Sequence, residues 1–233
     1  MAYPGVHAQT RPDHLAVVMA GSGESLTYRE LDERSNQIAH LIRHHGLERG
    51  DRIALFMENQ IRYMEVVWGA LRSGVYVTAV NSFLTAEEAA YIIDDCDAQI
   101  VITSRAKAEA AAAIDPATTP QVKRWLMCDG LPATSAIEWE SFEDVVGAMP
   151  TAPIADESPG YQMLYSSGTT GRPKGILRPL PDTPIDFLNE ALLRRFLVNY
   201  EYSPDMTYLS PAPMYHAAPL AFSTTVHRVG GPS

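Results

Sequence analysis

The sequence predicts an α/β protein in which a layered, parallel-rich sheet is flanked by helices. Apolar runs of strand length alternate with segments of helical periodicity, and this alternation implies parallel pairing through crossover helices. Two of the runs, 75–80 and 98–103, carry no charged residue. Strands of that kind suit burial on both faces of a sheet, so we expect helices on each side of it.

The first predicted helix has a start that is marked by side chains. Thr27 followed by Glu30 forms a capping box, in which each side chain bonds the other residue's backbone N–H. Gly46 ends the helix, since glycine is common just after the last helical turn. The neighbouring predicted elements are a strand at 15–19, a strand at 52–57, a helix from about 60 to 72 and a strand at 75–80.

A second capping box, formed by Thr85 and Glu88, starts a helix that runs to about residue 95. The strand–helix alternation then continues. The sequence shows no internal repeat of the length typical of solenoid proteins. The further predicted elements are a strand at 99–103, an alanine-rich helix at 105–114, a strand at 121–128 and a short helix at 141–148.

A proline-rich segment, 149–159, divides the predicted organisation and is typical of a linker or surface crossing. We therefore expect a first α/β subdomain at 1–159, a hairpin at 160–178 and the start of a second α/β subdomain at 179–233. The hairpin consists of a strand at 161–165, a loop and a return strand at 175–178. The last part is predicted to contain a helix at 185–200 and a strand at 206–209.

Composition limits the classes of function. The 233 residues are 46% hydrophobic and 20% charged, and their net charge of −10 argues against nucleic acid as a partner. Cys96 and Cys128 have no partners at metal-binding spacing and are predicted to be buried free thiols. We find no signal peptide and no run of membrane-spanning length, so we expect a reducing, cytoplasmic setting.

The segment 165–175 reads Tyr-Ser-Ser-Gly-Thr-Thr-Gly-Arg-Pro-Lys-Gly and follows an apolar strand. Its glycines allow tight turns whose backbone N–H groups bind anions, while its hydroxyls, Arg172 and Lys174 add donors and positive charge. This chemistry predicts a polyphosphate site. The glycine spacing excludes the P-loop of nucleotide hydrolases. A flexible Ser/Gly linker, with Lys174 as a solvated surface residue, is the alternative.

The same segment resembles the signature of the adenylate-forming, or AMP-binding, superfamily, which includes acyl-CoA synthetases, peptide-synthetase adenylation domains and beetle luciferases. The match holds at every position of that signature. The resemblance implies that this loop closes over the β- and γ-phosphates of ATP. The residues that it assigns to phosphate binding or to the shape of the loop are Ser166, Ser167, Gly168, Thr169, Thr170, Gly171 and Lys174.

Further likeness extends from about residue 12 to residue 229 in the family's order. It includes Leu-Thr-Tyr-Arg-Glu-Leu at 26–31, Gly-Asp-Arg-Ile-Ala at 50–54 with Asn59, and Ala-Leu-Arg-Ser-Gly at 70–74. The sequence Pro-Met-Tyr-His at 213–216 resembles the motif that lines the acyl pocket. Tyr215 and His216 are therefore expected to line the substrate pocket, with His216 as the candidate catalytic residue. A core tyrosine and a hydrogen-bonded loop histidine are the alternatives.

The resemblance implies that the parent protein uses ATP and Mg²⁺ to convert a carboxylic acid, by overall likeness a fatty acid, into an acyl-adenylate. Coenzyme A then takes the acyl group as a thioester. The family's Mg²⁺-binding glutamate, ribose-binding aspartate and C-terminal lysine are not found, so we expect less than half of a family member and no turnover by these residues alone. A silent nucleotide-binding fragment and an amino-acid adenylation domain stay open. At 177–181, Leu-Arg-Pro-Leu-Pro replaces the Thr-His or Ser-His pair of many members.

Overall fold

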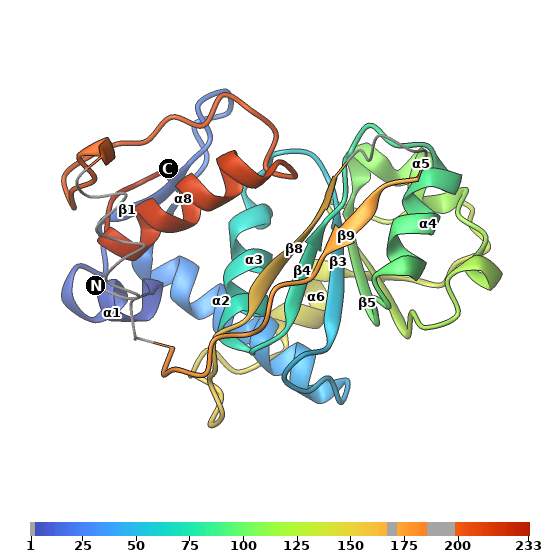
Figure 1. Cartoon of the computed structure of the whole chain (residues 1–233), viewed down its shortest axis with the longest axis horizontal. Helices are drawn as coiled ribbons and strands as arrows, with labels where there is room; N and C mark the ends of the chain where they lie inside the picture. Colours follow the sequence, from blue (N-terminus) through green and yellow to red (C-terminus); the bar gives the residue numbers. More distant parts are fainter. Residues whose placement is uncertain (1–2, 167–171, 186–198) are drawn as a thin grey trace.

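The computed structural model describes residues 3–166, 172–185 and 199–233. It confirms the α/β class, with a sheet between two layers of helices (Figure 1). The strands are β1 (Leu15–Val18), β2 (Ser25–Thr27), β3 (Arg52–Phe56), β4 (Tyr76–Ala79), β5 (Ile100–Ser104), β6 (Arg124–Cys128), β7 (Trp139–Ser141), β8 (Tyr161–Ser166) and β9 (Lys174–Ile176). The helices are α1 (Pro4–Thr10), α2 (Tyr28–His44), α3 (Arg62–Arg72), α4 (Ala86–Asp95), α5 (Ala108–Ala112), α6 (Phe142–Gly147) and α8 (Ala217–Val229), with short 3₁₀ turns at Arg105–Lys107 and Pro116–Thr118.

The main sheet has seven strands in the order β7-β6-β5-β3-β4-β8-β9. All neighbouring pairs are parallel except β8 and β9, which are antiparallel. From β3 the chain first adds β4 on one side and then β5 on the other, so the strand order reverses at this point. In sheets of this type, ligands bind outside the carboxyl ends of strands near such a reversal.

Successive residues of the central strands pack into two separate cores. On β3, Ile53 and Leu55 belong to the core that contains α2 and α3, whereas Ala54 and Phe56 belong to the core that contains α4. This period of two follows from strand geometry. Because both faces are covered, β3, β4 and β5 contain no charged residue beyond Arg52 at the strand start, as the uncharged runs predicted.

Both predicted capping boxes are present. The Thr27 hydroxyl accepts from the Glu30 backbone N–H at 3.3 Å, and the Glu30 carboxylate accepts from the Thr27 N–H at 2.8 Å. Thr85 and Glu88 repeat the arrangement at the start of α4. Gly46 adopts a φ of 74° just beyond α2. Cys96 and Cys128 are free and buried, as predicted.

Several elements differ from the sequence prediction. Residues 206–209 form no strand, because the only described backbone bond from this run to a distant segment is from the Tyr208 N–H to the Pro232 carbonyl. The run packs instead against the aromatic side of α8. The sequence did not indicate α1, β7 or α8, and α5 is shorter than the predicted helix at 105–114. Most of the helix predicted at 185–200 lies outside the described residues.

The chain ends meet in a polar network inside the small β1–β2 layer, where Figure 1 shows the N- and C-terminal segments side by side. The buried Tyr28 hydroxyl donates to the Gly231 carbonyl at 2.8 Å. His227 is fully buried; its Nδ1 accepts from the Trp68 indole N–H at 2.9 Å, and its Nε2 lies 2.9 Å from the Ala16 carbonyl. This network fixes α8 against α2 and α3.

The segment that precedes β8 is bound tightly rather than loosely tethered. Arg72, which is 1% exposed, forms ion pairs with Glu157 at 2.7 Å and with Asp32 at 2.9 Å. The Gly160 N–H donates to the Leu71 carbonyl at 2.7 Å. These contacts set where β8 enters the sheet beside β4. In the described part of the chain, no helix combines the length and apolarity that crossing a bilayer requires.

Candidate nucleotide and acyl site

The predicted strand–loop–strand hairpin is formed by β8 and β9. The two strands are antiparallel, and Ser166 at the end of β8 pairs with Lys174 at the start of β9. β8 also pairs in parallel with β4, so the hairpin belongs to the main sheet. Ser167, Gly168, Thr169, Thr170 and Gly171 lie outside the described residues. Because Ser166 pairs with Lys174, the two ends of the predicted phosphate loop meet at the carboxyl end of β8.

Helix α4 holds both ends of the hairpin. The Tyr91 hydroxyl donates to the Pro173 carbonyl at 3.1 Å, and the Arg172 guanidinium lies 4.9 Å from the centre of the Tyr91 ring. On the other strand, the Tyr165 hydroxyl donates to the Asp95 carboxylate at 2.5 Å. Burial, together with this bond, raises the pKa of Tyr165, so its hydroxyl stays protonated and keeps donating.

A cavity of about 630 Å³ opens beside the hairpin. It runs along the length of β8, past the carboxyl end of β4, to the first two turns of α8. Its lining is mainly aliphatic and aromatic, with a few polar groups. The residues that line it are Ala79, Asn81, Leu84, Ile92, Tyr161, Gln162, Leu164, Tyr165, Ser166, Pro173, Ile176, Arg178, Tyr215, His216, Ala217 and Ala221.

Three of the predicted site residues, Ser166, Tyr215 and His216, come together around this cavity. Lys174 is exposed at the hairpin and is not among the lining residues, although its neighbour Pro173 is. His216 is the residue that precedes the first turn of α8, and its ring lies 4.4 Å from that of Tyr215. The unpaired N–H groups at this helix start favour a negatively charged ligand.

Asn59 fixes the loop that carries Tyr215 and His216. Its side-chain amide donates to the Ala212 carbonyl at 3.0 Å, and its side-chain oxygen accepts from the Met214 N–H at 2.8 Å. In the sequence, Asn59 accompanies the family-like run at 50–54, but nothing there gave it a role in the site. Its partners are more than 150 residues away, so spacing along the chain could not reveal this contact.

The described residues lack the ligands that a Mg²⁺ site requires. Mg²⁺ is bound through carboxylates and phosphates in octahedral geometry. Within the described part of the chain, no Asp or Glu lines the cavity, and no group of three potential metal ligands occurs. These residues therefore do not fit a protein-bound Mg²⁺.

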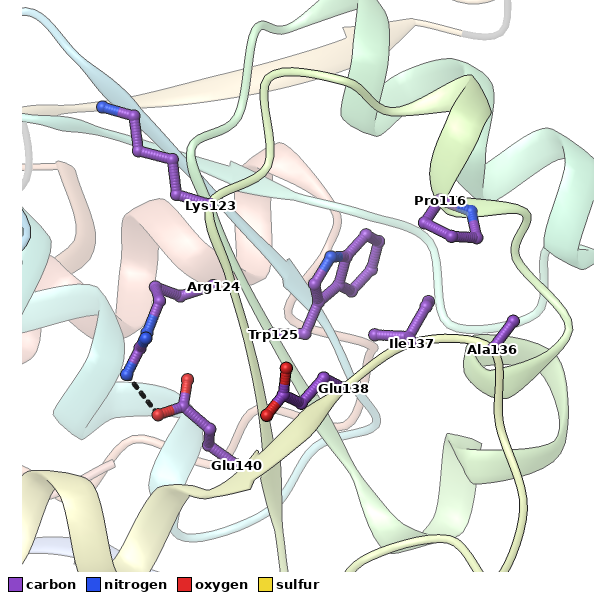
Figure 2. A pocket seen from close by; sticks show the side chains of 8 residues that line it. All are labelled: Pro116, Lys123, Arg124, Trp125, Ala136, Ile137, Glu138 and Glu140. Atoms are coloured by element: carbon purple, nitrogen blue, oxygen red, sulfur yellow. Dashed lines mark hydrogen bonds and ion pairs between the residues drawn. The ribbon is translucent and has the colours of Figure 1, made fainter.

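A second, smaller pocket of about 230 Å³ lies at the other end of the sheet, between β6 and β7 (Figure 2). Its charges are balanced, because Arg124 and Glu140 form an ion pair across it. Lys123 points away from the pocket centre and donates to the Gln99 side chain at 2.7 Å. This pocket contains none of the predicted site residues.

Comparison with known proteins defines the class to which this fold and site belong. The AMP-binding enzyme family matches residues 6–232, almost the whole chain. The chain belongs to this family of adenylate-forming enzymes, as the signature at 166–174 indicated.

Individual relatives support the same assignment. The chain is 31% identical over 167 residues to a 3-oxocholest-4-en-26-oate–CoA ligase of Rhodococcus rhodochrous, with 69% of this chain and 30% of the relative covered. It is 32% identical over 171 residues to the fatty acid–[acyl-carrier-protein] ligase ScoC of Streptomyces coeruleorubidus, with coverages of 73% and 31%. The chain thus spans about a third of the length of these relatives.

Among solved structures, the ATP-bound MatB of Rhodopseudomonas palustris matches with a TM-score of 0.71 and 25% identity. The match covers 99% of this chain and 44% of that chain. A putative long-chain-fatty-acid CoA ligase of Rhodopseudomonas palustris matches with a TM-score of 0.81 and 21% identity over 99% of this chain and 55% of that chain. The described fold is therefore that of the first part of an acyl-CoA ligase-like domain.

Proposed function

We propose that this chain forms part of a ligase that activates a fatty acid with ATP and transfers the acyl group to coenzyme A. The observation that carries the proposal is the cavity that starts at Ser166, where the hairpin loop begins, and is walled by Tyr215 and His216. An apolar cavity beside a phosphate-binding loop suits an acid with a hydrocarbon tail.

In the first step, a carboxylate oxygen of the acid attacks the α-phosphorus of ATP. The bond to the bridging oxygen breaks, so pyrophosphate leaves and an acyl-adenylate forms. In the second step, the coenzyme A sulfur loses its proton and attacks the acyl carbon, and AMP leaves. Negative charge grows on oxygens in both steps, so fixed N–H and hydroxyl donors lower the barriers.

The roles of individual residues belong to the proposal. The hydroxyls and N–H groups of 166–171, together with Lys174, hold the phosphates, and Gly168 and Gly171 shape the loop. Tyr215 and His216 orient the acid at the start of α8, where the helix end favours its carboxylate. Because the described residues supply no carboxylates to the cavity, no step is assigned to Mg²⁺ bound by this chain.

We also propose a division of the chain into subdomains and a cellular location. We divide the chain into a first subdomain at 1–159, the hairpin at 160–178 and the start of a second subdomain at 179–233. We place the protein in the cytoplasm and expect no complete turnover from these 233 residues alone.

A second candidate differs in the acceptor. The relative ScoC is named as a ligase that uses an acyl-carrier protein, so a carrier-protein thiol could replace coenzyme A in the second step. The first step would be the same.

Acid-dependent exchange of pyrophosphate into ATP tests the first step, measured on the longest protein that contains this chain. We expect exchange with fatty acids and none with amino acids. Exchange that only amino acids support would favour an amino-acid adenylation domain, and no exchange with any acid would overturn the proposal. Supplying coenzyme A or a carrier protein then separates the two acceptors.

A further inference from the structure

Arg178 brings a positive charge to the wall of the cavity. It follows β9, and its backbone carbonyl accepts from the Tyr76 hydroxyl at 2.6 Å, so its main chain is fixed to β4. Its guanidinium donates to the Tyr161 hydroxyl at 3.4 Å and lies 6.0 Å from the centre of that ring. These contacts hold the side chain beside the start of β8.

This charge is not neutralised by the protein part that the structure describes. The ion pairs among the described residues do not include Arg178, and no Asp or Glu of that part lines the cavity. The remaining wall around it is largely apolar, with Ile176 and Leu164 nearby in the hairpin pairing. Arg178 is exposed, and a guanidinium without a carboxylate partner attracts an anionic group and binds carboxylates in bidentate geometry.

The position of Arg178 separates it from the phosphate loop. Ser166 pairs with Lys174 and Leu164 pairs with Ile176, so continuation of this register places Arg178 level with Gln162. Ser166 lies four residue steps along β8 from that level, which corresponds to about 13 Å. An acid whose carboxylate is oriented by Tyr215 and His216 and faces the loop at Ser166 would reach Arg178 with the far end of its chain.

We propose that Arg178 binds a second anionic group at the far end of the acid, so that the substrate class includes medium- to long-chain dicarboxylic acids. This inference rests on the proposed function, because it assumes that the cavity binds the acid. It specifies which acid is preferred. The sequence at 177–181 departs from the family pattern here, and Arg178 of this segment lines the cavity.

Titration calorimetry on the 233-residue chain with decanoate and with decanedioate tests this. The two acids have the same chain length and differ by one terminal carboxylate. We expect decanedioate to bind about tenfold more tightly to the wild type, and Arg178→Gln to remove the difference. Arg178→Lys keeps the positive charge but lacks the planar guanidinium, so it should retain part of the preference for decanedioate.

Arg105→Gln is the matched control, because Arg105 bonds only the Leu131 carbonyl among the described contacts and does not line the cavity. It should leave the preference unchanged, and thermal melts should show that all variants are folded. An unchanged preference in Arg178→Gln, or a loss of ATP affinity instead, would overturn the assignment of Arg178. Binding of neither acid to the wild type would overturn the proposed function and this inference with it.

Discussion

The side chain of Asn59 and the backbone of Met214 are joined by a hydrogen bond of 2.8 Å across 155 residues of sequence. With its second bond, to the Ala212 carbonyl, Asn59 connects the segment after β3 to the loop that carries Tyr215 and His216. The segment that follows β3 thus sets the position of one wall of the cavity.

Asn59→Ala should therefore weaken acid binding about tenfold and leave ATP affinity within about twofold, because the phosphate loop lies on a different element. Calorimetric titration of the chain with decanoate and ATP measures both. Asn59→Asp keeps the oxygen that accepts from the Met214 N–H, so it should lose less acid affinity than Asn59→Ala. Equal losses for both ligands would show that Asn59 supports the whole fold rather than this wall.

Gly160 has no room for a side chain where the linker enters β8. A Cβ at this position would lie 2.8 Å from the Ala70 carbonyl oxygen and closer still to that of Val75. Gly160→Ala should lower the free energy of unfolding by about 2 kcal/mol or more. Urea denaturation measures the change. Gly147→Ala, where a Cβ would meet nothing within 4 Å, should change stability little, and a similar loss in both would contradict the explanation.

Arg72 is the buried counter-charge for Asp32 and Glu157. Arg72→Ala leaves these largely buried carboxylates without a cationic partner and should cost about 3–5 kcal/mol of unfolding free energy. Arg29→Ala breaks an exposed ion pair with Asp13 and should cost less than about 1 kcal/mol. Denaturation curves of the two variants give the comparison; equal losses would mean that burial of the pair is unimportant.

His227 predicts a pH dependence of stability. Burial lowers its pKa from 6.5 to about 4, so the unfolded chain binds a proton that the folded chain does not between these values. The contribution of neutral His227 to the free energy of unfolding is fully present above about pH 6.5 and is lost as the pH falls toward 4. This loss amounts to at most about 3 kcal/mol. Burial also lowers the pKa of His7, which acts in the same direction.

Unfolding free energies at pH 7 and pH 4.5 test this dependence. The wild type should lose stability between the two values, and His227→Gln should lose less across the same interval, although it starts from a lower value. His44→Gln, at an exposed position, should behave as the wild type. An unchanged pH slope in His227→Gln would contradict the assignment.

The sequence predicted the parts of the fold that local chemistry determines. The capping boxes at Thr27 and Thr85 and the uncharged strands carry their own signals, and each was confirmed. Helix α8 starts in Ala-Ala-Pro without a side-chain cap, and tertiary bonds such as that between Trp68 and His227 stabilise it. The residues next to its start therefore give no sequence signal that predicts α8.

The site residues likewise divide into those that the sequence indicates and those that only the folded structure reveals. Ser166, Tyr215 and His216 could be proposed from the sequence because their motifs are continuous along the chain, and all three line the cavity. Asn59 and Arg178 were missed as site residues because their roles depend on which segments meet after folding. The strand predicted at 206–209 was wrong because apolar residues at strand spacing still need a neighbouring strand, and this run has none among the described residues.

The central claim is that the hairpin between Ser166 and Lys174 holds the triphosphate of ATP. Titration of the 233-residue chain with ATP, compared with Lys174→Ala and Lys174→Arg, measures it most directly. We predict saturable binding that Lys174→Ala weakens about tenfold and that Lys174→Arg largely retains. Equal ATP affinity in the wild type and Lys174→Ala, or no binding to the wild type, would contradict the account.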